Sequence, residues 1–175
     1  MKRVAILGST GSIGQSTLSI IESYPERFAV ASLAAGRNID IAYEQCLRWQ
    51  PKVVSLATEE AAAELRQRLK SAGAADTEVV WGTEGTVRVA TVPEADFVVS
   101  AIVGVAGLEA TYAAVEAGKT IGLANKEAMV AAGDILTEAA WRKRVALLPI
   151  DSEHNAVHQC MRAGERREVR RIWLT

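Results

Sequence analysis

The sequence predicts an α/β fold in which helices cover both faces of an open, doubly wound and mostly parallel sheet. Three observations support this prediction. Short β-branched runs alternate with stretches of helical spacing along the 175 residues. These runs are apolar on both faces, as parallel strands between two layers of helices must be. The first run leads directly into a glycine-rich turn, GSTGSIG, which opens the first helical stretch.

Seven runs are predicted strands, and each is followed by helical spacing or a helix-start signal. They are RVAIL, FAVASLA, KVVSL, EVVW, DFVVSA, KTIGLA and VALLPI. The first helix should end before Pro25, because proline cannot continue a helix. Asn38 is a predicted cap of the second helix. Thr58 opens a third, which carries acidic residues in its first turn and basic residues in its last.

Composition narrows the classes of partner. Twenty basic against 21 acidic side chains give a net charge of −1 without long runs of either sign, so we expect neither nucleic acid nor a membrane as a partner. The longest apolar run, FVVSAIVGVAGL, is too short to span a membrane, and no signal peptide is expected before the first strand. Cys46 and Cys160 match no CxxC spacing, which favours reduced thiols in a cytoplasmic protein over a disulfide. Small molecules are the expected partners.

The loop from Gly8 to Gly14 predicts dinucleotide binding. It joins the first strand to the first helix, where a Rossmann-type sheet binds pyrophosphate. Glycines let backbone N–H groups approach phosphate oxygens, the helix N-terminus adds partial positive charge, and Thr10 and Ser12 add hydroxyl donors. The spacing is GxxGxxG and not the commoner GxGxxG, so a purely structural turn is the alternative.

The end of the second predicted strand indicates which nucleotide binds. An acidic side chain there would bond the ribose 2′-hydroxyl of NADH, whereas a basic one would hold the 2′-phosphate of NADPH. In LAAGRN, Ala34 and Ala35 leave the acidic position empty, and Arg37 followed by Asn38 offers a cation and a helix start. NADPH is therefore favoured, with a solvated loop arginine as the alternative.

The segment ANKEAMV carries candidate catalytic groups. Asn125, Lys126 and Glu127 follow the KTIGLA strand, at the carboxyl edge of the sheet where open α/β proteins bind ligands. The alternative is structural, because Asn125 is also a good helix cap and the two charged residues suit a helix surface.

The segment PIDSEHNAVH suggests a metal site. From an extended segment, Asp151 and Glu153 could point the same way and offer carboxylate oxygens to Mg²⁺ or Mn²⁺. A helix cap is the alternative role for Asp151. His154 and His158 have the spacing of a zinc pair, but no third ligand of the right type is evident nearby, which disfavours zinc.

Together these motifs resemble one enzyme family. GSTGSIGQSTL, LAAGRN, SAIVGVAGL, LANKEAMV and LLPIDSEHNA, in this order and spacing, are similar to the amino-terminal half of 1-deoxy-D-xylulose 5-phosphate reductoisomerase. The resemblance runs over nearly the whole chain. It implies conversion of 1-deoxy-D-xylulose 5-phosphate to 2-C-methyl-D-erythritol 4-phosphate, by skeletal rearrangement and hydride reduction with NADPH and Mg²⁺ or Mn²⁺. This reaction belongs to the methylerythritol phosphate route to isoprenoids.

The resemblance also implies residue roles. Cofactor contacts are implied for Thr10, Gly11, Ser12, Ile13, Gly36, Arg37, Asn38, Asn125 and Glu127. Lys126 and Glu153 would be catalytic, and both would contact the sugar phosphate substrate together with Ser152. Asp151 and Glu153 would bind the metal. Family members often carry lysine at the position of Arg37, and either cation would serve a phosphate.

The expected organisation is an NADPH-binding domain over residues 1–150 and the beginning of an α+β catalytic domain over residues 151–175. A family member would continue beyond RRIWLT, whose alternation predicts a strand of that second domain. We therefore expect an amino-terminal portion that binds NADPH but is inactive alone, and a homodimer only for the full-length enzyme. The alternatives are another NADP-dependent dehydrogenase, of homoserine or aspartate-semialdehyde type, and a stand-alone NADPH-binding module.

Overall fold

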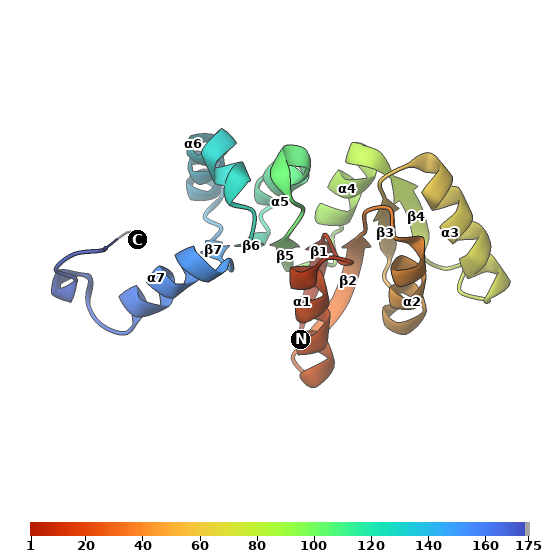
Figure 1. Ribbon diagram of the computed structural model, residues 1–175, viewed down its shortest axis with the longest axis horizontal. Coiled ribbons are helices and arrows are strands. Elements are labelled where there is room, and N and C mark those ends of the chain that lie inside the picture. Colours follow the sequence, from red (N-terminus) through yellow and green to blue (C-terminus); the bar gives the residue numbers. More distant parts are fainter. Residues whose placement is uncertain (174–175) are drawn as a thin grey trace.

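The computed structural model describes residues 1–173 and confirms the doubly wound α/β fold (Figure 1). Seven strands form a sheet in the order β4-β3-β2-β1-β5-β6-β7, and every pairing in it is parallel. They are β1 Lys2–Leu7, β2 Phe28–Ala34, β3 Val53–Leu56, β4 Glu78–Trp81, β5 Phe97–Ser100, β6 Thr120–Leu123 and β7 Leu147–Pro149. Each of the seven predicted strands is present.

Helices cover both faces of the sheet. They are α1 Ser12–Ser23, α2 Ile39–Trp49, α3 Glu59–Ser71, α4 Gly82–Ala90, α5 Leu108–Glu116, α6 Lys126–Lys143 and α7 Ser152–Arg162, with short 3₁₀ turns at Gly104–Gly107 and Arg166–Glu168. One buried apolar cluster joins α1, α2 and α3 to one face, and a second joins α4, α5 and α6 to the other. No helix within residues 1–173 is long and apolar enough to cross a membrane.

The predicted caps form where the sequence places them. The side chain of Asn38 accepts a hydrogen bond from the backbone N–H of Ile41 at 3.1 Å and starts α2. Thr58 does the same for α3 through the N–H of Ala61 at 3.3 Å. These bonds satisfy donors that a helix start otherwise leaves unpaired, so local residue chemistry sets the boundaries of these elements.

The strand order places the candidate motifs on one edge of the sheet. β1 lies at the centre, and the chain builds outward to β4 before it crosses over and pairs β5 with the other side of β1 (Figure 1). The loops after β1, β2, β5, β6 and β7 all leave from the carboxyl edge. The topological switch point between β1 and β5 is where open α/β sheets bind ligands.

The predicted strand at RRIWLT does not form within residues 170–173, and Leu174 lies outside the described residues. Residue alternation alone cannot make a strand, because a strand needs a hydrogen-bonding neighbour, and none runs beside this segment in the described part of the chain. The guanidinium of Arg171 instead stacks over the ring of Trp173, 5.0 Å from its centroid. α7, which precedes this segment, buries none of its residues.

Both cysteine thiols are free, and their surroundings predict different reactivity. Cys46 is buried in α2, and burial raises the pKa of its thiol to about 12, whereas Cys160 is exposed on α7. At pH 8 we expect a thiol-disulfide reagent to modify Cys160 alone in the folded chain, and Cys46 only after unfolding. Because folding raises the Cys46 pKa, stability should fall as the pH rises above the unfolded thiol's value of about 8.5. Replacing Cys160 with serine should abolish the native reaction, and equal modification of both thiols would contradict this assignment.

Candidate functional site

The glycine loop presents an uncapped helix start to the carboxyl edge of the sheet. Gly11 is the N-cap of α1 in extended conformation, and no side chain caps this helix. The first N–H groups of α1 therefore remain free for an anion. The backbone N–H groups of Gly8 and Ser9 both donate to the carbonyl of Ala34, at 2.8 and 2.9 Å, which fixes the loop against the end of β2.

A pocket of about 430 Å³ opens beside this loop. Of the predicted residues, Thr10, Gly11 and Gly36 line it, whereas Ser12, Ile13, Arg37 and Asn38 lie outside its lining. Three further walls come from the loop after β3, the start of α4 and the loop after β5; their lining residues include Thr83, Thr86, Ile102 and Val103. No role was predicted for these residues, although they follow the predicted strands EVVW and DFVVSA, whose carboxyl ends face the same edge of the sheet.

Two glycines of this pocket are not required by the protein's own packing. A Cβ built on Gly11 would meet only the carbonyl oxygen of Gly8, at 3.4 Å, and one on Gly36 would meet nothing within 4 Å. Neither has the positive φ that favours glycine. What these positions leave open is space in the pocket, and a ligand that lies close to the backbone would need that space. The residues present therefore fit a dinucleotide.

The predicted 2′-phosphate end lies just beyond Gly36. Arg37 is exposed, and no ion pair within residues 1–173 engages its guanidinium. The side chain of Asn38 is occupied as the cap of α2. A free cation next to a helix start is the arrangement that binds a phosphate.

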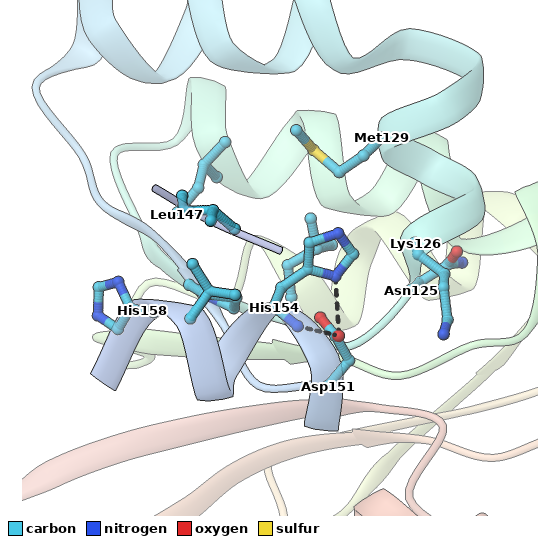
Figure 2. Close-up of a pocket in the computed structure, with 11 residues that line it drawn as sticks. Asn125, Lys126, Met129, Leu147, Asp151, His154 and His158 are labelled. Atoms are coloured by element: carbon cyan, nitrogen blue, oxygen red, sulfur yellow. Dashed lines mark hydrogen bonds and ion pairs between the residues drawn. The ribbon is translucent and has the colours of Figure 1, made fainter. Parts of the chain in front are cut away.

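A second pocket, of about 660 Å³, lies between the start of α6, β7 and α7 (Figure 2). Three predicted residues line it, namely Asn125, Lys126 and Asp151. Figure 2 shows Met129 of α6 and His154 of α7 projecting into the space between their helices. Most of the remaining lining is aliphatic, so the few polar groups, which also include His154 and His158, set where a polar ligand can bind.

Asn125 links the two pockets. Its side chain is 4% exposed, its Oδ1 accepts from the N–H of Ala128 at 3.0 Å, and its Nδ2 donates to the carbonyls of Ile102 and Gly104. Both the oxygen and the nitrogen of the amide are therefore hydrogen-bonded to backbone groups of the protein. The predicted contact between Asn125 and the cofactor stays a prediction. The bonds from Nδ2 hold the loop after β5, part of which lines the first pocket, and we call this pair of bonds the Asn125 clamp.

Lys126 bridges the two predicted catalytic segments. Its Nζ lies 3.2 Å from Oε2 of Glu153 in the first turn of α7. A hydrogen bond from the backbone N–H of Glu153 itself, and the bond from Lys126, hold the pKa of the Glu153 carboxyl below its ordinary value. The carboxylate therefore remains charged at neutral pH. Glu127 and Ser152 are exposed in the first turns of their helices.

Asp151 is itself extended, but the chain is helical from Ser152 onward, so the expectation of an extended segment that carries both Asp151 and Glu153 is wrong. Asp151 caps α7, because its Oδ1 accepts from the backbone N–H of His154 at 2.9 Å and lies 2.8 Å from the ring Nδ1 of the same residue. Partial burial acts to raise the pKa of Asp151, but these hydrogen bonds outweigh it, and the net pKa lies below the ordinary value. The helix-cap alternative is thus present in the structure.

The donor set for a metal is partial within residues 1–173. The described residues hold no group of three or more His, Cys, Asp or Glu side chains placed for a metal ion. Asp151 and Glu153 offer hard carboxylate oxygens of the kind that Mg²⁺ and Mn²⁺ prefer. His154 is engaged with Asp151, so the zinc pair with His158 gains no support.

A parallel sheet with a glycine loop beside its topological switch point defines the class of Rossmann-type nucleotide-binding folds. The family model described as 1-deoxy-D-xylulose 5-phosphate reductoisomerase matches residues 4–133. The chain belongs to the 1-deoxy-D-xylulose 5-phosphate reductoisomerase family.

Individual relatives support this membership. The 1-deoxy-D-xylulose 5-phosphate reductoisomerase of Anaeromyxobacter dehalogenans is 53% identical over 175 residues, which cover 100% of this chain and 44% of that protein. A crystal structure of DOX-P reductoisomerase with NADPH, fosmidomycin and magnesium matches with a TM-score of 0.87 and 42% identity, over 91% of this chain and 39% of that one. The structure of the Zymomonas mobilis enzyme in complex with NADPH matches with a TM-score of 0.84 and 40% identity. The match covers 91% of this chain and 41% of that one. This chain spans less than half the length of these relatives.

A dehydrogenase of homoserine type, one of the alternatives that the sequence leaves open, is more distant from this chain. A homoserine dehydrogenase from Thiobacillus denitrificans matches with a TM-score of 0.53 and 23% identity, over 85% of this chain and 29% of that one. At that identity the likeness shows a shared fold and nothing more. The reductoisomerase relatives are closer in both measures.

Proposed function

We propose that the chain acts in the NADPH-dependent conversion of 1-deoxy-D-xylulose 5-phosphate to 2-C-methyl-D-erythritol 4-phosphate, in the supply of isoprenoid precursors. Residues 1–150 would form the NADPH-binding domain, and residues 151–175 the beginning of the catalytic domain. The observation that carries the proposal is the first pocket, where Gly11 and Gly36 leave space beside an uncapped helix start. The absence of buried residues in α7 supports the division near residue 150.

NADPH would bind along the carboxyl edge of the sheet and supply the hydride. The free N–H groups at Ser12 and Ile13 would bind the pyrophosphate, assisted by the positive end of α1. The guanidinium of Arg37 would hold the 2′-phosphate through charge-assisted hydrogen bonds. The solved relative with NADPH, fosmidomycin and magnesium supports both this cofactor and a divalent metal here.

The second pocket would receive the sugar phosphate. Asp151 and Glu153 would hold Mg²⁺ or Mn²⁺, which when bound stabilises negative charge on substrate oxygens. Lys126 would donate a hydrogen bond to such an oxygen, and Glu153, charged at neutral pH, would accept a hydroxyl proton. Asn125, through its clamp on the loop after β5, would hold cofactor and substrate pockets in register.

The proposal includes a cellular location and an oligomeric state. Two free thiols and a balanced charge support a cytoplasmic location. The homodimer proposed for the full-length enzyme rests on the family resemblance. No nucleic acid is proposed as a partner, because neither sign of charge dominates.

Nucleotide titration tests the cofactor assignment. By nucleotide fluorescence, we expect NADPH to bind at least tenfold tighter than NADH, a difference of about 1.4 kcal/mol. Arg37→Ala should weaken NADPH binding roughly 10- to 30-fold and leave NADH within about twofold, because only NADPH carries the 2′-phosphate. Arg27→Ala, an exposed arginine before β2 at the opposite edge of the sheet, is the matched control. Equal losses for both nucleotides in Arg37→Ala would contradict the assignment.

Manganese titration tests the metal assignment. Asp151→Asn keeps an oxygen that can cap α7 but removes the charge, so Mn²⁺ affinity followed by paramagnetic resonance should fall about tenfold or more with α7 intact. Since the pKa values of Asp151 and Glu153 lie below ordinary carboxyl values, protons should compete with the metal only below about pH 4. Asp134→Asn, an exposed aspartate of α6, is the control. Equal affinity in both variants would rule out Asp151 as a ligand.

A further inference from the structure

We infer that Gln45 of α2 is a positioning residue that fixes the pyrophosphate-binding loop relative to the 2′-phosphate end of the cofactor site. This rests on the proposed function and deepens it. Gln45 is 7% exposed, and its Nε2 donates a hydrogen bond of 2.9 Å to the backbone carbonyl of Ser9. Ser9 is fully buried within the glycine loop, directly before Thr10 and Gly11.

Other contacts to Ser9 come from β2 and α1. Its backbone N–H donates to the carbonyl of Ala34 at the end of β2. Gly14 of α1 packs so closely on it that a Cβ there would lie 2.6 Å from the Ser9 Cα. Gln45 adds a bond from α2. This side-chain bond connects the glycine loop to α2, and the proposed 2′-phosphate site lies at the start of α2.

Each of the two residues in this contact also has a buried polar atom without a hydrogen-bond partner. Ser9 Oγ and Gln45 Oε1 are the buried side-chain polar atoms without a hydrogen-bond partner in residues 1–173. These unpaired atoms oppose folding. The bond from Nε2 satisfies the buried carbonyl of Ser9, and an apolar side chain in place of Gln45 would leave that carbonyl unpaired instead. What the buried amide contributes is therefore the directional bond from Nε2, which an apolar side chain could not make.

The position of Gln45 along α2 determines which parts of the proposed cofactor site the bond connects. It lies about two helical turns after Asn38, which follows Arg37 at the start of the helix. The bond to Ser9 therefore links the two ends of the proposed site, Thr10 and Gly11 at one and Arg37 at the other. A ligand that bridges both ends should depend on this link. One that reaches only the 2′-phosphate end should not.

The test compares two ligands on one variant. Gln45→Met keeps the length of the side chain and removes the donor. We expect its NADPH affinity to fall roughly fivefold or more, as the loss of one buried hydrogen bond implies. Adenosine 2′-monophosphate, which lacks the pyrophosphate, should bind within twofold of its affinity for the unchanged chain. Cys46→Ala is the control, because Cys46 is the buried neighbour on α2 and makes no hydrogen bond to the loop.

The possible results are distinct. NADPH affinity within twofold of the unchanged chain in Gln45→Met overturns the inference, and so does a parallel loss of both ligands. Should Gln45→Met fail to fold, Gln45→Glu carries the test, since it keeps the shape and replaces the donor with an acceptor facing the Ser9 carbonyl. Absence of NADPH binding by the unchanged chain overturns the proposed function as well as this inference.

Discussion

Gly14→Ala is expected to lower the free energy of unfolding by roughly 3 kcal/mol or more. A Cβ at Gly14 would lie 2.3 Å from the carbonyl oxygen of Gly8 and 2.6 Å from the Cα of Ser9. These are backbone atoms held by hydrogen bonds to β2, so they cannot move aside as a flexible side chain would. Because whole domains are stable by only about 5–15 kcal/mol, this loss should be plain in urea unfolding followed by circular dichroism.

Gly11→Ala is the matched control and should behave in the opposite way. Its Cβ meets protein only at 3.4 Å, so the free energy of unfolding should change by less than about 1 kcal/mol. The added methyl group would occupy the pocket where the pyrophosphate approaches, and NADPH affinity should fall by roughly tenfold or more. Normal stability in Gly14→Ala, or normal NADPH binding in Gly11→Ala, would contradict the packing described for the loop.

Asn125→Leu should have the second large effect. It keeps the approximate size of the side chain but leaves the carbonyls of Ile102 and Gly104 and the N–H of Ala128 without their partner. A buried group left unpaired costs about 1–3 kcal/mol, and the carbonyls of Ile102 and Gly104 are only partly buried, so a total loss of roughly 3 kcal/mol is expected in chemical unfolding. NADPH affinity should fall too, because Ile102 and the following residue line the cofactor pocket.

Asn125→Asp separates the helix cap from the Asn125 clamp. The aspartate keeps an oxygen for the cap on Ala128 but loses the donor to Ile102 and Gly104. Because a carboxylate at this buried position would face two carbonyl oxygens, it should lose at least as much stability as Asn125→Leu at neutral pH, together with a comparable part of the NADPH affinity. If the two variants matched the unchanged chain in both measurements, the clamp would have no role in either the fold or the site.

The fold followed from the sequence because its determinants are local. Apolar runs mark the strands, and Asn38 and Thr58 cap their helices by bonds to residues three positions further on. The site was less predictable. Lys126 meets Glu153 across 27 residues, and Thr83 reaches the cofactor pocket only because α4 crosses over the sheet. Asp151 shows the limit clearly, since one short motif suits both a metal ligand and a helix cap, and only the three-dimensional arrangement shows the cap.

The role inferred for Gln45 could not be predicted from the sequence either. Within its own helix it is one polar residue beside an apolar stripe, and nothing in the surrounding letters distinguishes it from a surface glutamine. Its bond spans 36 residues to Ser9, and the burial of both groups depends on how α2 packs beside the loop. Polar residues whose partners are backbone groups of a distant loop leave no pattern of spacing for a sequence to show.

The central position of β1 has a consequence for the nascent chain. Strands β2, β3 and β4 each emerge from the ribosome after the neighbour they pair with, and the same holds for β5, β6 and β7 on the other side. The sheet can therefore grow in the order of translation, one strand at a time, without waiting for a later partner. One edge of β1 stays unpaired until β5 is synthesised, the longest interval for any strand edge that is paired in the finished sheet. During that interval the exposed edge of β1 is where a chaperone would protect the chain, or a second nascent chain would aggregate with it.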